Sequence, residues 1–96
     1  MSVYVDDMYK HPMGRLGRMK MSHMVADTTD ELLEMADAIG VARKHIQNPG
    51  TVREHFDVSL GRRQMAVEQG AVEITMRELG RMMREKWRGR QDASST

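Results

Sequence analysis

The side chains best suited to chemistry are aspartates and histidines that occur in three short segments. They are Asp6, Asp7, His23, Asp27, His55 and Asp57. Carboxylate oxygens and imidazole nitrogens together suit a divalent ion such as magnesium, manganese or zinc. The expected metal ligands are Asp6, His23, His55 and Asp57. A histidine beside an aspartate can also act as a general base with the carboxylate that orients it, so metal binding and acid–base chemistry both stay open.

The spacing within a pair decides whether its side chains can meet. His23 and Asp27 are four residues apart, and they share a face if their segment is a helical turn. His55 and Asp57 share a side if their segment is extended. Both pairings are physically possible for the sequence.

A basic segment that contains glycines follows the first two aspartates. Its cations and glycines are Lys10, Gly14, Arg15, Gly17, Arg18 and Lys20. Positive charge beside a backbone that a ligand can approach closely suits a phosphate group or a nucleic-acid backbone. The spacing matches neither a P-loop nor a dinucleotide fingerprint. We therefore expect a phosphate-bearing ligand, a nucleotide or a nucleic-acid end, without a motif that identifies it.

The run from Val3 to Val5 is the element that we expect to position these groups. It is apolar without alternation, which predicts a short strand covered on both faces. Asp6 and Asp7 mark its carboxyl end, and they point to opposite sides if both continue the strand. Ligands of open α/β sheets bind beyond the carboxyl ends of the strands, so we expect the site at that edge.

Helix signals follow further along the chain. Thr28 with Glu31 and Thr75 with Glu78 form capping boxes ahead of apolar residues at helical spacing. The predicted helices cover about 28–39, 59–69 and 75–90. The second of them has Asp57 or Ser59 as its candidate cap and ends at Gly70.

Two further segments predict strands, a short one over 71–74 and a weaker edge strand over 41–47. A helical turn is the alternative for 41–47. Strands thus alternate with helices along the chain. This order predicts an α/β fold with a small parallel three-stranded sheet flanked by three helices, and with a long basic loop after the first strand.

Length and composition limit the classes of protein. The 96 residues suit one small domain, which we expect over 1–90, with a disordered polar tail over 91–96. The chain has no cysteine, which favours a reducing cytosol. No apolar run approaches the ~20 residues that span a bilayer, so we expect no membrane partner. A formal net charge of +1 argues against a histone-like nucleic-acid binder.

Several motifs, spread over the chain up to about Leu79, form a recognisable set. They are Tyr4-Val5-Asp6-Asp7, Gly14-Arg15, the run from Met21 to Asp27, Glu31-Leu32, His55-Phe56-Asp57, Gly70-Ala71-Val72 and Arg77-Glu78-Leu79. This set resembles the domain of unknown function DUF4031, a family of small proteins of bacteria and their phages. The resemblance implies a phage or prophage accessory protein with no established activity. It points to a polar set of Asp6, Asp7, Arg15, His23, Asp27, His55, Asp57 and Arg63. Together with Arg18 of the basic segment, these are the expected ligand-binding residues.

Two hypotheses of function follow. The first is a protein that binds a phosphate-bearing ligand at the carboxyl edge of the sheet, with a divalent metal as a candidate cofactor; whether it also catalyses a reaction stays open. The second is a non-catalytic interaction protein, a homo-oligomer or a host-protein binder. It would dock through an acidic face on the first helix and an arginine stripe on the last. The stripe consists of Arg77, Arg81, Arg84 and Arg88. Binding of DNA by this stripe ranks last, because no helix-turn-helix signature accompanies it.

Overall fold

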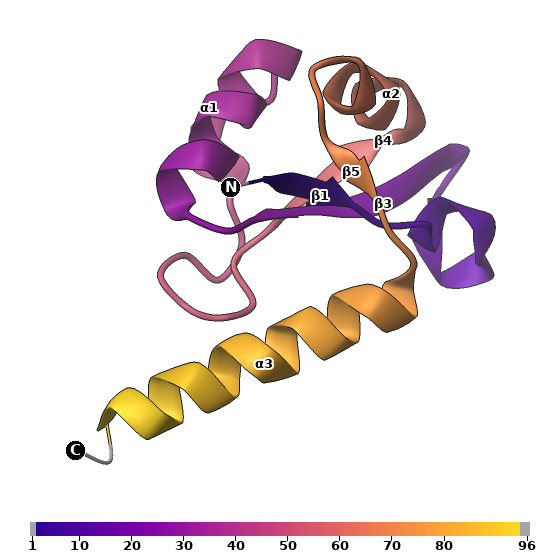
Figure 1. Cartoon of the computed structure of the whole chain (residues 1–96). Helices are drawn as coiled ribbons and strands as arrows, with labels where there is room; N and C mark the ends of the chain where they lie inside the picture. The colour runs from indigo at the N-terminus through magenta and orange to yellow at the C-terminus, as the bar shows by residue number, and fades with distance from the viewer. Residues whose placement is uncertain (1, 95–96) are drawn as a thin grey trace.

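Figure 1 shows the computed structural model, which describes residues 2–94 of the chain and the side chains of residues 2–90. The strands are β1 (Val3–Val5), β2 (Arg15–Leu16), β3 (Met19–Ala26), β4 (Phe56–Ser59) and β5 (Val72–Glu73). The α-helices are α1 (Thr29–Ile39), α2 (Leu60–Glu68) and α3 (Met76–Ser94). Short 3-10 helices are η1 (Met8–Lys10), η2 (Pro12–Gly14) and η3 (Arg43–His45). Within this described part, no helix is long and apolar enough to cross a membrane.

Strand β3 is the centre of a mixed sheet. It pairs antiparallel with β1, with β2 and with β4, whereas β1 and β5 run parallel. The α/β class is therefore confirmed, but the expected sheet of three parallel strands is wrong. The prediction missed β3, because the polar residues Ser22 and His23 interrupt its apolar pattern and glycines precede it.

The expected long basic loop is not a loop. Its first part folds into η1 and η2, and its second part into the β2–β3 hairpin. Gly17 forms the turn of this hairpin with a φ of +62°, a conformation that favours glycine. The segment 41–47 likewise forms η3 and an isolated bridge between Gln47 and His55, instead of an edge strand.

The capping boxes produce the helix starts that the sequence predicts. The Thr28 hydroxyl accepts the Glu31 N–H at 3.2 Å, and α1 ends at Gly40 with a φ of +76°. The Thr75 hydroxyl accepts the Glu78 N–H at 3.1 Å at the start of α3. This last helix continues to Ser94, into the predicted tail, and residues 95–96 lie outside the described part.

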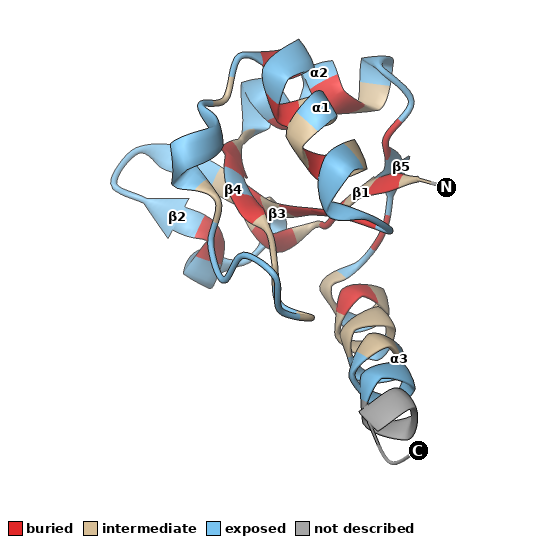
Figure 2. Cartoon of the chain, turned by 90° about the vertical axis from the view of Figure 1, so that its left-hand side faces the viewer, coloured by how far each residue is buried: buried red, intermediate tan, exposed pale blue. Residues whose placement is uncertain are grey.

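The two faces of the sheet are covered differently (Figures 1 and 2). Helices α1 and α2 lie on one face, where Met24, Leu32 and Phe56 belong to the main core. Helix α3 lies on the other face, where Val25 and Leu79 form a smaller cluster. Because successive side chains of a strand point to opposite faces, β1 and β3 contribute residues to both layers.

Candidate metal centre

Strand alternation places the chemically active side chains on the face that α3 covers. His23 lies two residues before Val25 in β3, and residues two apart in a strand share a face. The β3–β4 register pairs His23 directly with Asp57, so these two project together. His55 lies two residues before Asp57 and joins them. The expected same-side placement of His55 and Asp57 is observed.

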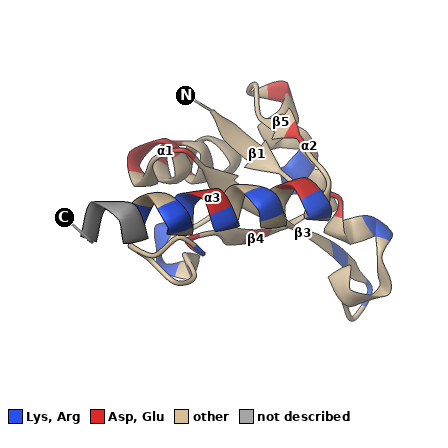
Figure 3. Ribbon diagram, turned by 60° about the horizontal axis from the view of Figure 1, so that its bottom comes forward, with Lys and Arg blue, Asp and Glu red and all other residues tan. Residues whose placement is uncertain are grey.

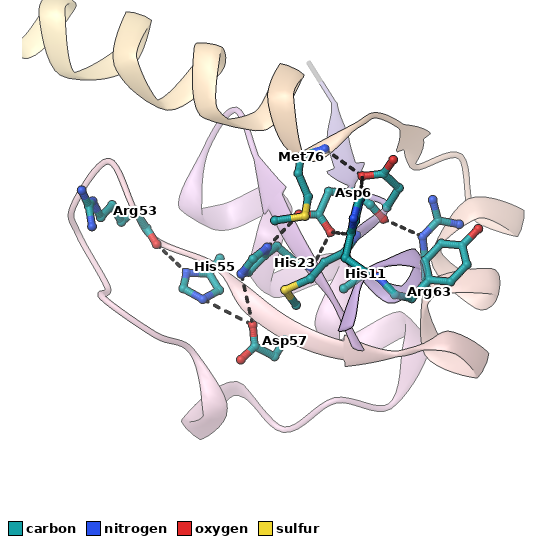
Figure 4. A network of polar contacts seen from close by, with 12 residues as sticks. Asp6, His11, His23, Arg53, His55, Asp57, Arg63 and Met76 are labelled. Carbon is teal, nitrogen blue, oxygen red and sulfur yellow. Dashed lines mark hydrogen bonds and ion pairs between the residues drawn. The ribbon is translucent and has the colours of Figure 1, made fainter. Parts of the chain in front are cut away.

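Three ligand atoms converge there, as Figure 4 shows. His23 Nε2 lies 3.9 Å and His55 Nε2 lies 3.4 Å from Asp57 Oδ1. The two imidazole rings meet edge to face, with their centroids 5.1 Å apart. Candidate ligand atoms of these three residues all lie within 4.8 Å of one another. Two imidazoles and one carboxylate therefore share one small volume.

The other nitrogen of each imidazole is already hydrogen-bonded. His23 Nδ1 lies 2.7 Å from Asp6 Oδ2, and His55 Nδ1 lies 2.6 Å from the Arg53 carbonyl. Because a carbonyl and a carboxylate accept hydrogen bonds, both Nδ1 atoms donate. In the neutral rings the Nε2 atoms then carry lone pairs that face Asp57. These lone pairs and the carboxylate oxygen repel one another unless a cation or a proton lies between them.

Asp6 acts on this site from behind His23. Its side chain is fully buried, and its Oδ1 accepts the N–H groups of His23 at 2.9 Å and Met8 at 3.1 Å. Burial alone raises the pKa of Asp6, but the hydrogen bonds from His23 and from these N–H groups hold its pKa below the ordinary range. The bond to Asp6 in turn raises the pKa of His23, against the opposing effect of burial. Both oxygens of Asp6 thus have donors, and the carboxylate orients His23.

Asp57 is oriented from the loop before β4. Gln47 Nε2 donates to Asp57 Oδ2 at 2.7 Å, which leaves Oδ1 directed at the histidines. The Gln47 backbone bonds that of His55 in both directions, at 2.8 and 3.1 Å. This bridge therefore positions both His55, which is a candidate ligand, and Gln47, which orients Asp57.

The trio has the composition and spacing of a metal site. Zinc–ligand bonds of about 2.1 Å in a tetrahedral arrangement separate ligand atoms by about 3.4 Å. The two distances to Asp57 Oδ1 are 3.4 and 3.9 Å, so small side-chain rotations close the set around an ion. Two histidines with one carboxylate hold zinc and non-haem iron with open coordination positions. Metal-bound histidines also donate their second N–H to a carboxylate or carbonyl, as both do here.

Comparison with known proteins places this site within a family. The family model described as protein of unknown function (DUF4031) matches residues 3–86. The chain belongs to this family. Neither the comparison with curated proteins nor that with solved structures finds a significant match. The matched range of this DUF4031 member contains the whole trio and Asp6.

Other expected ligand residues of this DUF4031 member lie elsewhere. Asp27 directly follows β3 and accepts the Ser2 N–H at 2.7 Å. An extended β3 replaces the helical turn that would have joined Asp27 to His23. Asp7 Oδ1 accepts the Met76 N–H at 2.8 Å, at the start of α3. Arg15 and Arg18 are exposed on the β2–β3 hairpin.

Arg63 is buried within the fold, behind Asp6. Its Nε donates to the Asp6 carbonyl at 2.9 Å, and its Nη1 donates to Glu73 at 2.8 Å. The guanidinium also lies over the Tyr9 ring, 4.8 Å from its centroid. Arg63 therefore holds the end of β1 in place next to the site.

A cleft of about 640 Å³ opens beside His23 and His55 and runs along α3. Its walls include His23 and His55, Arg53 of the loop before β4, and Arg84 and Trp87 of α3. Arg84 belongs to the arginine stripe of the sequence analysis, whereas Arg53 and Trp87 are not among the ligand-binding residues that the sequence predicts. Nothing local in the sequence indicates that these three residues border the histidines.

Proposed function

We propose that the protein binds a divalent metal ion through His23, His55 and Asp57, and that the ion holds a phosphate-bearing ligand in the cleft. The convergence of both Nε2 atoms on Asp57 Oδ1, with both Nδ1 atoms hydrogen-bonded behind them, carries this proposal. Zinc, manganese and magnesium are the ions to compare. The imidazole ligands favour zinc over manganese and magnesium.

The phosphate ligand is supported by the surroundings of the trio. Three protein ligands leave positions on the ion for a ligand oxygen. Arg53 from the loop before β4 and Arg84 from α3 both line the cleft, and guanidinium groups suit phosphate oxygens. The proposed site lies on the α3 face of β3 and β4, beside Asp6 at the carboxyl end of β1.

The interaction-protein alternative rests on exposed charges. Figure 3 shows acidic residues on α1 and basic residues along α3. On α1, Asp37 already pairs with Arg43 of the same chain at 2.7 Å. Exposed ion pairs contribute little individually. The metal centre is the stronger candidate, because it includes a buried carboxylate and aligned hydrogen bonds.

Titration with zinc, manganese and magnesium tests the metal centre. We expect saturable binding of one equivalent of zinc. His55→Ala should weaken it by more than about 100-fold, since loss of an outer partner alone costs ~10–100-fold. His45→Ala is the matched control, because His45 is exposed in η3, and its zinc affinity should equal that of the wild type. Equal affinities of the His55 and His45 variants would refute the site.

Calorimetry with inorganic phosphate tests the second half of the proposal. The zinc-loaded protein should bind phosphate, and the protein treated with chelator should bind it more weakly. Phosphate binding that is the same with and without zinc would separate the phosphate site from the metal and contradict the proposal.

A further inference from the structure

We infer that the phosphate-bearing ligand is a nucleoside phosphate whose base packs against Trp87. This inference rests on the proposed function, because the phosphate end must lie at the metal centre. It adds a nucleobase at the other end of the ligand, and it assigns a role to the part of α3 around Trp87.

The cleft has two chemically different ends. Asp6 and His23 border the end where α3 begins, since Met76 is fixed there by the carboxylate of Asp7. Trp87 borders the cleft eleven residues further along the same helix. A rise of about 1.5 Å per residue puts these two positions about 16 Å apart along the axis. A ligand that fills the cleft is therefore anionic at one end and contacts an indole at the other.

The wall between the two ends is apolar. Leu79 and Met83 of α3 face Val52 of the loop before β4. The volume of about 640 Å³ lies in the ~300–1,000 Å³ range of small-molecule sites. An apolar wall and a flat indole suit an aromatic ring system, which a free phosphate or a sugar phosphate lacks.

Trp87 is placed for stacking and is otherwise unexplained by the fold. Its side chain is 54% exposed, although a large apolar side chain of a structural helix normally packs into the core. Bases stack on exposed aromatic rings in sequence-tolerant nucleic-acid sites. Trp87 also lies one residue beyond the range matched by the family, which ends at 86.

Arginines complete the recognition of such a ligand. Arg84 precedes Trp87 by three residues and lines the cleft, whereas Arg81 is exposed on the same helix and is not part of the cleft wall. Within residues 2–90, neither Arg53 nor Arg84 takes part in an ion pair. Both guanidinium groups are therefore available to the phosphate or the sugar.

Fluorescence gives a direct test, because Trp87 is the single tryptophan of the chain. Zinc-loaded protein is titrated with adenosine monophosphate and, in parallel, with ribose 5-phosphate, which has the same phosphate and sugar but no base. We expect saturable quenching by adenosine monophosphate only. The affinity for ribose 5-phosphate, measured by calorimetry, should be roughly 10-fold to 100-fold weaker, as base stacking on an aromatic ring implies.

Variants separate this inference from the proposed function. Trp87→Leu should keep the zinc affinity and bind the two phosphates equally. Arg84→Ala should weaken adenosine monophosphate binding, and Arg81→Ala is its matched control. Circular dichroism verifies that each variant keeps its helix content. Absence of zinc binding would refute the proposed function, whereas zinc binding with equal affinity for both phosphates would refute only the base contact.

A short single-stranded oligonucleotide with a terminal phosphate identifies the source of the nucleoside phosphate. Zinc-dependent binding that is tighter than that of adenosine monophosphate and lost in Trp87→Leu assigns the cleft to a nucleic-acid end. Equal or weaker binding assigns it to a free nucleotide. Oligonucleotide binding that needs neither zinc nor Trp87, together with no response to adenosine monophosphate, would overturn the inference.

Discussion

Replacement of Asp6 by asparagine is the most direct test of how the site is organised. Asparagine keeps the shape of the side chain and an oxygen for the N–H groups of His23 and Met8. It replaces Oδ2, which lies 2.7 Å from His23 Nδ1, with an NH₂ donor. Facing a donor, His23 Nδ1 must accept, and the ring proton moves to Nε2. The metal then has to displace that proton.

The expected loss of zinc affinity in Asp6→Asn follows from this exchange. Loss of an outer-shell partner costs about 10–100-fold in metal affinity, or about 1.4–2.8 kcal/mol. A hydrogen bond to a charged group contributes about 1.5–3 kcal/mol, which agrees with that range. Competition with a chromophoric chelator measures the affinity, and thermal unfolding of the zinc-free protein verifies the fold. Asp27→Asn is the matched control, because Asp27 is exposed at the far end of β3.

Either of two results would refute this reasoning. An unchanged zinc affinity would mean that Asp6 does not set the protonation of His23. A loss as large as that of His55→Ala would make Asp6 a direct ligand, as the sequence alone suggests.

Two further predictions concern stability without metal. The pKa of His23 is raised above its ordinary 6.5, and that of Asp6 is lowered below its ordinary 3.8. The contribution of His23 to folding stability is therefore complete below pH 6.5 and is lost as pH rises through its folded-state pKa. The contribution of Asp6 is complete above pH 3.8 and is lost as pH falls through its folded-state pKa. The difference in urea-unfolding free energy between wild type and His23→Gln, measured with chelator, should be largest between these limits; a difference that is flat from acid to alkaline pH would contradict the coupling. Arg63→Ala should destabilise the protein by about 3 kcal/mol, since it leaves the buried Asp6 carbonyl without its donor, and Arg63→Lys should restore only part of this because lysine lacks the fork of donors. A loss below about 1 kcal/mol in urea unfolding would contradict the role of Arg63.

Features set by neighbouring residues could be predicted from the sequence. The starts of α1 and α3 depend on hydroxyl and carboxylate groups three residues apart, and a capping box is visible in any sequence that contains one. The pairing of His55 with Asp57 is equally local, because alternation in an extended segment needs no partner strand. These predictions therefore did not depend on the topology.

Features set by strand pairing could not be predicted in this way. The approach of His23 to Asp57 depends on the register between β3 and β4, whose residues are more than thirty positions apart. Ser22 and His23 replace apolar residues in the middle of β3, and they weakened the strand signal at the site itself. Local rules tend to fail at functional positions for this reason. Asp27 was grouped with His23 only because β3 went unrecognised.

The adjacent residues Asp6 and Asp7 link the candidate site to the start of α3. The Asp6 carboxylate accepts a hydrogen bond from the imidazole of His23, and the Asp7 carboxylate accepts one from the first N–H group of α3. Asp6 and Asp7 are joined by a single planar peptide bond. A substitution that shifts the end of β1 would therefore disturb both the orientation of the His23 ring and the start of α3, which lines the cleft.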